Sequence, residues 1–389
     1  MGRHVIGLAA FVLAGCGFEH GELSTSSMID APMIDAPDAE IDSPAITCTP
    51  GFVDLCNATP GPALAIAGAD TINTDNDPRC VTVAQAAGSA VCLVYASSVM
   101  IGSSASLTAT GSRPLAIASA STLAIDGIVD VSSQRVTAQI GPAADYSACA
   151  VMTPAEDDAG GAGGGAGASF ANVGGDGGTG DTDMGTSADG SAVGGRPGGA
   201  ATVTFLRGGC RGEAGADNPT SGAQGGDGGH GGGALYLFAH DQVAISGIVR
   251  ATGAGGVGGT IMPTGSGGGG GGGGSGGLVV IESAAIAISG QISANGGGGG
   301  EGAFVGGNGG GPLDGRGGDD GVVGTTAAAG GHNTGYVGTG TGGAGAAGTT
   351  TAVNGGNSVA GGGGGGGAAG RVKLIGSSTI SGIVSPPAS

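Results

Sequence analysis

Apolar residues occupy every second position in several short blocks of the chain, and glycine-rich stretches separate these blocks. Three blocks align without a gap, and they are PLAIASASTLAIDGIVDVS (114–132), ALYLFAHDQVAISGIVRAT (234–252) and GLVVIESAAIAISGQISAN (277–295). A fourth block at 371–387 aligns when two residues are left out of its middle turn, and a fainter copy lies at 92–111. A period of two is that of a strand, so each full block predicts three short strands joined by tight turns.

A leucine and a glycine mark each of the three gapless copies. Leu115, Leu235 and Leu278 each stand twelve residues before a glycine. The residues between the apolar positions, among them Tyr236 and Lys373, are expected to face outward. The residues expected to face inward are Leu115, Ile117, Leu123, Ile125, Val129 and Val131; Leu235, Leu237, Val243, Ile245, Val249 and Ala251; Leu278, Val280, Ile286, Ile288, Ile292 and Ala294; and Val372 and Leu374.

No single copy is large enough to bury its inner face, so the copies are expected to pack against one another. Turns of three strands that stack on each other give one continuous core, and in this respect the sequence resembles secreted β-solenoid proteins of the adhesin type over roughly residues 60–385. The resemblance implies an all-β fold: an irregular right-handed parallel β-helix (β-solenoid) with long glycine-rich insertions. The alternative is a β-sandwich, which needs antiparallel hairpins, and Asp126-Gly127 is a candidate hairpin turn.

Glycine accounts for 97 of the 389 residues and fills the insertions between the blocks. The insertions cover 159–200, 208–233, 253–277 and 296–370, and a short strand is expected over 201–207. Glycine brings no apolar side chain, so these segments are not expected to add to an ordinary hydrophobic core. Two states are open for them, a flexible coil or a bundle of packed extended helices like those of polyglycine II.

Residues 1–15 are typical of a signal peptide. A cationic start precedes an apolar run from Val5 to Leu13, which is too short to span a membrane as a helix. The sequence LAGC that ends at Cys16 resembles the lipobox of bacterial lipoproteins, whose cysteine carries lipid after cleavage. This resemblance implies lipidation of Cys16 and, because the next residue is Gly17 rather than aspartate, the outer membrane or cell surface. The alternative is an ordinary secretory signal with a free cysteine nearby.

The segment 16–47 is acidic and rich in proline, and it contains MIDAP twice. Such a composition offers no apolar face to bury, so we expect an extended tether behind the lipidated cysteine. Three further regions are expected: 48–158 as the first β-solenoid part with disulfides, 159–233 as a glycine-rich insertion, and 234–389 as β-solenoid coils with glycine-rich insertions.

The cysteine count supports export. If Cys16 carries lipid, six cysteines remain, enough for three disulfides in an oxidising compartment. Fifteen pairings are possible, and the shortest loops join Cys48 to Cys56, Cys80 to Cys92 and Cys149 to Cys210. No C-x-x-C spacing of a zinc site occurs.

The net charge of −19 argues against nucleic acid as a partner, because a basic patch is missing. No cofactor is expected, and calcium is a weak possibility because carboxylates cluster in two glycine-rich stretches without matching a known calcium repeat. The carboxylates concerned are Asp176, Asp181, Asp183 and Asp189 in the first stretch, and Asp314, Asp319 and Asp320 in the second.

No catalytic constellation emerges from the sequence. Asp130 and Arg250 are the charged pair of one aligned column, and His230, His240 and His332 lie far apart without a nucleophile pattern. We therefore predict no enzyme, but a lipoprotein of the cell envelope with a structural, display or adhesive role. Its partners would be the membrane, through the lipid, and surface polysaccharide or other cell-surface proteins. The alternative is a β-helix protein that binds or cleaves glycans.

Overall fold

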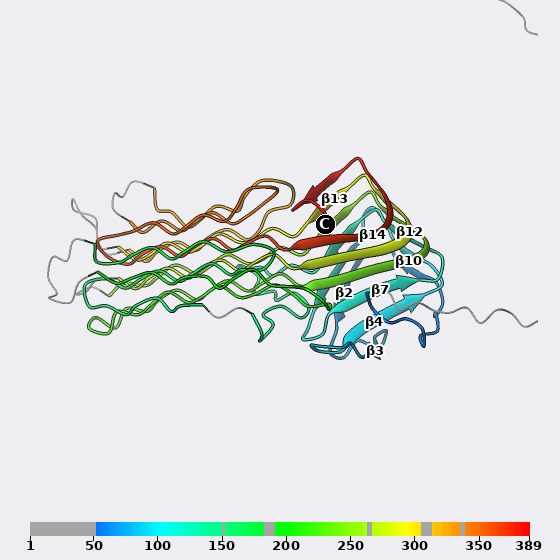
Figure 1. Cartoon of the computed structure of the whole chain (residues 1–389), viewed down its shortest axis with the longest axis horizontal. Coiled ribbons are helices and arrows are strands. Elements are labelled where there is room, and N and C mark those ends of the chain that lie inside the picture. Colours follow the sequence, from blue (N-terminus) through cyan, green and yellow to red (C-terminus); the bar gives the residue numbers. More distant parts are fainter. Residues whose placement is uncertain (1–51, 150–151, 183–190, 263–266, 305–312, 335–338) are drawn as a thin grey trace, which may run out of the picture. The chain divides into compact units, whose positions relative to one another are not determined.

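The strand-forming blocks build two β-sheets (Figure 1), and a computed structural model describes residues 52–149, 152–182, 191–262, 267–304, 313–334 and 339–389. These residues contain no helix, so the predicted all-β class is confirmed for the described part of the chain. They belong to one compact unit, Thr49–Ser389.

The larger sheet has nine strands and the smaller has six. The nine are β1 (Leu64–Ile66), β3 (Val81–Val83), β4 (Val91–Ala96), β5 (Val99–Ile101), β7 (Leu115–Ser119), β8 (Thr122–Ile125), β10 (Ala234–Ile245), β12 (Leu278–Ile288) and β14 (Arg371–Ile380). The six are β2 (Ala69–Asn73), β6 (Ser106–Thr110), β9 (Ile128–Asp130), β11 (Ile248–Arg250), β13 (Gln291–Ser293) and β15 (Ile383–Ser385).

Successive copies of the repeat pair with each other in parallel. In the larger sheet β7 and β8 pair with β10, which pairs with β12 and then β14, and in the smaller sheet β9, β11, β13 and β15 follow in order. Among the described strands, only β3 and β4 pair antiparallel. Asp126-Gly127 is not a hairpin turn, because β8 and β9 on either side of it belong to different sheets.

The prediction of a tight turn between the first two strands of each copy is wrong for the copies at 234–252, 277–295 and 371–387. β10, β12 and β14 each run through this position as one strand, and the register shifts there, for example between Ala239 and Gln242. A bulge absorbs extra residues while the ladder continues on both sides. This explains how copies with different numbers of residues stay aligned.

In the first half of β12, the register of the third copy differs from the gapless alignment by one residue. Leu235 pairs with Val279 and Leu237 with Ile281. The inward residues of this copy are therefore Val279 and Ile281, which join the inner core, and not Leu278. The strand LVVI is apolar at every position, so the period of two cannot fix its register. Val280, which is also predicted to face inward, lies with Leu278 in a separate buried cluster on the other face of the sheet. The remaining predicted inward residues, from Leu115 to Leu374, lie in or against the inner core.

The outer face of the first strand halves is covered, which corrects the expected exposure of Tyr236. Tyr236 is fully buried in a second core that also contains Leu278 and Val280. Phe52 and Val53 cross this face, with the Phe52 ring 6.4 Å from the Tyr236 ring. Lys373 is exposed as expected. The sheet is thus packed on both faces where it meets the chain's entry segment.

The glycine-rich segments are extended, and they lie beside one another in the part of Figure 1 away from the strands. In segment 267–277, the partner of the backbone N–H changes with each residue and returns to the same neighbour after three. A period of three is that of a polyproline II-type helix, which has no internal hydrogen bonds. The donor and acceptor pairs are Gly268 to Thr260, Gly271 to Val257 and Gly274 to Ala254; Gly269 to Ala216, Gly272 to Glu213 and Ser275 to Cys210; and Gly270 to Gly362, Gly273 to Gly365 and Gly276 to Ala368.

The carbonyl groups of the same segment serve three further neighbours, so six segments surround it. Ala162, Gly226 and Ala303 donate the first bond from each of these neighbours, to Gly267, Gly269 and Gly268 respectively. Every residue from Gly268 to Gly277 therefore faces another backbone, and its N–H is satisfied without water. Of the two states left open for the insertions, packed polyglycine II-like helices are the one observed.

A glycine segment at the outside of the bundle has one side without a neighbouring segment, and its sequence carries larger side chains at a three-residue spacing on that side. In 224–232, Gln224, Asp227 and His230 stand three residues apart with glycine between them. Gln224 and Asp227 are exposed, while the glycines at 226, 229 and 232 bond to neighbours. The strand expected over 201–207 is not formed, because Leu206 and Arg207 are buried without a ladder partner.

Candidate functional site

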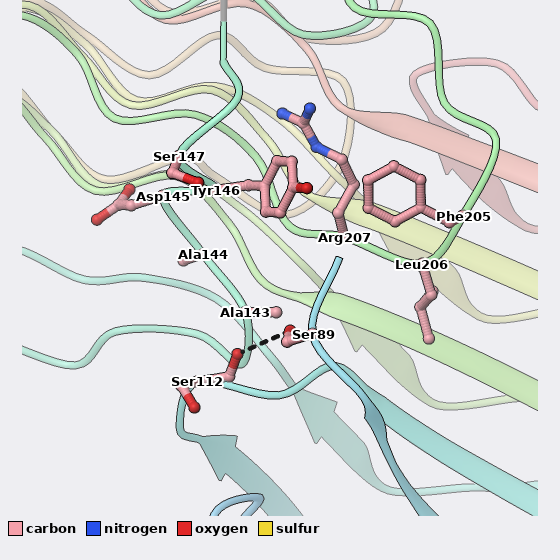
Figure 2. A pocket seen from close by; sticks show the side chains of 10 residues that line it. All are labelled: Ser89, Ser112, Ala143, Ala144, Asp145, Tyr146, Ser147, Phe205, Leu206 and Arg207. Carbon is pink, nitrogen blue, oxygen red and sulfur yellow. Dashed lines mark hydrogen bonds between the residues drawn. The ribbon is translucent and has the colours of Figure 1, made fainter. Parts of the chain in front are cut away.

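A pocket lies where the strand-bearing part meets the glycine bundle (Figure 2). Its volume is about 240 Å³, and it is open to solvent on one side. The lining residues are Ser89, Ser112, Ala143, Ala144, Asp145, Tyr146, Ser147, Phe205, Leu206 and Arg207. Tyr146 and Phe205 meet edge to face with their ring centres 5.4 Å apart. The pocket combines aromatic and hydroxyl groups with one guanidinium.

Arg207 is the unusual member of this pocket because it is 4% exposed and makes no ion pair with a carboxylate in the described part of the chain. Its guanidinium carbon lies 4.8 Å from the centre of the Tyr146 ring and 5.1 Å from that of Phe170. Cation–π contacts of this kind partly replace lost hydration. Burial nevertheless lowers the pKa of Arg207 from its ordinary value.

A disulfide lies directly against this guanidinium. Cys149 and Cys210 are bonded, and Nη2 of Arg207 lies 3.2 Å from Sγ of Cys149 and 3.1 Å from Sγ of Cys210. The second described disulfide joins Cys80 to Cys92. Both are the shortest-loop pairings of these cysteines. Cys56 is also disulfide-bonded, and Cys48, its expected partner, lies outside the described residues.

His230 is held by Asp145, on the rim of the same pocket. Nδ1 of His230 contacts Oδ2 of Asp145, while Oδ1 of Asp145 accepts a hydrogen bond from the Gly231 N–H at 2.8 Å. No described serine or cysteine donates to His230, so the pair lacks the nucleophile of a catalytic triad. His240 pairs with the neighbouring Asp241 at the surface.

Two of the carboxylates considered as calcium ligands, Asp314 and Asp320, accept hydrogen bonds from the backbone. Asp320 accepts hydrogen bonds from the backbone N–H groups of Arg135 and Gly255, and Asp314 accepts one from Ile261. Asp183 and Asp189 lie outside the described residues. The described parts contain no group of three or more His, Cys, Asp or Glu side chains that is arranged to hold a metal ion.

Two glutamates of the bundle, Glu301 and Glu213, also accept hydrogen bonds from backbone N–H groups. Glu301 is fully buried and accepts hydrogen bonds from the backbone N–H groups of Arg316 and Asn333 and from the Asn333 amide. Burial raises the pKa of Glu213, and hydrogen bonds from Ala166 and Ala155 oppose that rise. Where a glycine helix lacks a neighbouring backbone, a carboxylate thus supplies the acceptor.

Asp130 and Arg250 form an ion pair across adjacent strands. The two residues are register partners on β9 and β11, and Nη2 of Arg250 lies 2.7 Å from Oδ2 of Asp130. Asp130 also accepts hydrogen bonds from Ser132 and Gln134. Its acceptor sites are therefore used within the protein.

The outer face of the second strand halves carries small side chains. One column runs through Ala124, Ala244, Ala287 and Thr379, and the column beside it through Thr122, Gln242, Ala285 and Ser377. These two columns offer no aromatic platform and no carboxylate to a sugar.

Several expectations concern residues that the structure does not describe. Cys16, the signal peptide and the tether 16–47 all lie outside the described ranges. Within those ranges, no helix is long and apolar enough to cross a membrane. No family model matches the chain, and neither does any curated protein or solved structure.

Sequence reasoning did not single out Arg207. The stretch TVTFLRGGC shows an arginine three residues before a cysteine, but nothing in it reveals that the side chain is buried.

Proposed function

We propose that this chain is a lipoprotein of the cell envelope that displays a rigid glycine bundle at the cell surface, with a structural or adhesive role. In this proposal Cys16 carries the lipid, residues 16–47 form the tether, and the paired strands form an irregular right-handed β-solenoid. The two disulfides in the structure fit an oxidising compartment outside the cytoplasm.

The observation that carries the display role is the order of the glycine segments. A flexible glycine coil cannot hold a turn at a fixed position. A bundle whose glycine helices are hydrogen-bonded to their neighbours holds its turns in place. The turn around Asn218–Ala223 lies at the end of the bundle away from the strands (Figure 1). The chain enters at the other part, where Phe52 is held on the sheet by Glu282. The turns at the end of the bundle are thus held in place, where they could face a partner.

The outer columns of small residues favour a scaffold over the glycan-active alternative. β-Helix enzymes that act on polysaccharides need clustered carboxylates with basic residues on one face. The aligned pair Asp130–Arg250 is an internal ion pair instead.

Anchoring is tested by metabolic palmitate labelling of the full chain with and without globomycin, with Cys16→Ala as the matched variant. We expect globomycin-sensitive label in the wild type and none in the variant. An unlabelled wild-type chain would overturn the lipid anchor.

Surface display is tested through Lys373, the only lysine of the chain, which is exposed. An amine-reactive biotin that does not cross membranes should label the chain on intact cells, and Lys373→Arg should abolish that label. Label that appears only after the cells are opened would contradict display. Retention of the chain on envelope polysaccharide, lost with Asp130→Asn, would favour the glycan-active alternative.

A further inference from the structure

Among the residues that the structure describes, no carboxylate contacts the guanidinium of Arg207, and its nearest polar neighbours are two sulfur atoms. Three hydrogen bonds are formed by this side chain: Nε donates to the Gly208 carbonyl, and Nη2 donates to the sulfurs of Cys149 and Cys210. A buried cation without a counter-ion is unfavourable. In the disulfide form, the charge of Arg207 is balanced only by ring faces and weak sulfur acceptors.

Breaking the disulfide changes this balance. A thiolate on Cys210 would lie within hydrogen-bond distance of Nη2 and would be the missing counter-ion. A nearby arginine lowers the pKa of a cysteine thiol, and a thiol of lower pKa is expelled faster from a disulfide. Arg207 therefore favours both the exchange reaction and its reduced product.

The two sulfurs differ in access, which fixes the direction of the reaction. Cys210 is 1% exposed, whereas Cys149 is only partly buried and follows Tyr146 and Ser147, which line the open pocket (Figure 2). An incoming thiolate must reach its target sulfur along the S–S axis. The more accessible sulfur, that of Cys149, is thus the one attacked, and the buried sulfur of Cys210 is the one that leaves.

We propose that Cys149–Cys210 is a thiol-exchange site, at which an external thiol forms a mixed disulfide with Cys149 and expels Cys210 as a thiolate held by Arg207. The attacking thiolate forms a new S–S bond to Cys149 as the old bond breaks and its electron pair moves to Cys210. With one equivalent of a monothiol the product is the mixed disulfide. With a dithiol, the second thiol displaces Cys149, so the protein disulfide is reduced and the dithiol is oxidised to its own disulfide.

The site gives the chain a way to join covalently to a partner that carries an accessible thiol. This inference does not depend on the lipid anchor or on surface display, because it rests on Arg207 and the two sulfurs alone.

The second disulfide is a built-in comparison. Cys92 is fully buried, and the guanidinium of Arg79 beside Cys80 is already paired with Asp70 and Asp77. The guanidinium of Arg79 is therefore not free to balance a leaving thiolate of Cys80–Cys92, and we expect this disulfide to exchange slowly.

The test follows both disulfides in the folded full chain. The protein is exposed to graded dithiothreitol without denaturant, quenched with N-ethylmaleimide and analysed by peptide mass spectrometry. We expect Cys149–Cys210 to be reduced about tenfold faster than Cys80–Cys92, and Arg207→Gln to slow that reduction about tenfold. Arg207→Lys should recover part of the rate, while Arg79→Gln should leave the reduction of Cys149–Cys210 unchanged. With one equivalent of reduced glutathione, the mixed disulfide should carry glutathione on Cys149.

Loss of stability cannot imitate the expected result, because a loosened fold exposes sulfur and speeds reduction. Equal rates for the two disulfides, an Arg207→Gln rate equal to or above the wild type, or an adduct on Cys210 would each overturn the proposal.

Discussion

Gly272 lies against the carbonyl group of Ala166 so closely that no side chain fits between the two segments. A Cβ at Gly272 would come within 3.0 Å of the Ala166 carbonyl oxygen, a separation that real Cβ atoms essentially never adopt. The N–H of Gly272 donates to Glu213 and its carbonyl accepts from Gly229, so the backbone cannot move away without losing bonds. Glycine at this position is a packing requirement.

Replacement of Gly272 by alanine is therefore expected to destabilise the bundle by about 1–3 kcal/mol, the usual cost of overpacking. Gly199, in the same kind of sequence, is the matched control, because nothing lies within 4 Å of its added Cβ. Gly199→Ala should change the free energy of unfolding by less than about 0.5 kcal/mol. Both are measured by urea denaturation, and equal effects would contradict the packed bundle.

The sequence predicts the strand-forming part well because its side chains carry a period. Ile125, Ile245 and Ile288 occupy equivalent positions, and the structure places all three in the inner core. The period fails where every residue is apolar. In LVVI, Leu278 and Val279 fit the inner face equally, and the pairing with Leu235 is settled by the length of the bulge that follows.

The packing of the glycine segments is harder to predict because glycine has no side chain to report its neighbours. The outer segments do carry a signal, since Gln224, Asp227 and His230 stand at the three-residue period of an extended helix. The fully surrounded segment 267–277 carries none. The burial of Arg207 cannot be predicted from the sequence either, because it depends on the rings of Tyr146 and Phe170, which lie far away along the chain.

Glu301 tests the role of carboxylates as backbone acceptors. Glu301→Ala leaves the N–H groups of Arg316 and Asn333 without their acceptor in a partly buried place, at an expected cost of about 1–3 kcal/mol. The control is Asp227→Ala, which removes an exposed carboxylate 3.5 Å from Arg211 and should cost about 0–1 kcal/mol. Thermal unfolding followed by circular dichroism compares the two, and a similar loss in both would argue against the acceptor role.

Asp77 is expected to make the free energy of unfolding of the chain depend on pH. Hydrogen bonds from Arg79 hold the pKa of Asp77 below its ordinary value of 3.8. The stabilisation is therefore complete above that value and is lost as the pH falls through the lower folded pKa. Asp77→Asn should cost about 0.5–1 kcal/mol at pH 7, a modest amount because Arg79 is partly exposed.

Denaturation curves of the wild type and Asp77→Asn between pH 7 and pH 2 check this. The difference between the two proteins should shrink below about pH 4, where the unfolded aspartate is protonated. A difference that grows on acidification would show that Asp77 is not the group concerned.

Variants of Asp130 and Arg250 distinguish a structural role of this ion pair from a glycan-binding role. Arg250→Met leaves the buried Asp130 with Ser132 and Gln134 as its donors and should destabilise the chain by about 1–3 kcal/mol. Asp130→Asn in the same chain removes the unpaired charge, so the double variant should lose less than the two single losses added together. Urea denaturation of the four proteins gives this coupling. Unchanged stability in Arg250→Met, together with loss of polysaccharide binding, would instead assign the pair to a ligand site.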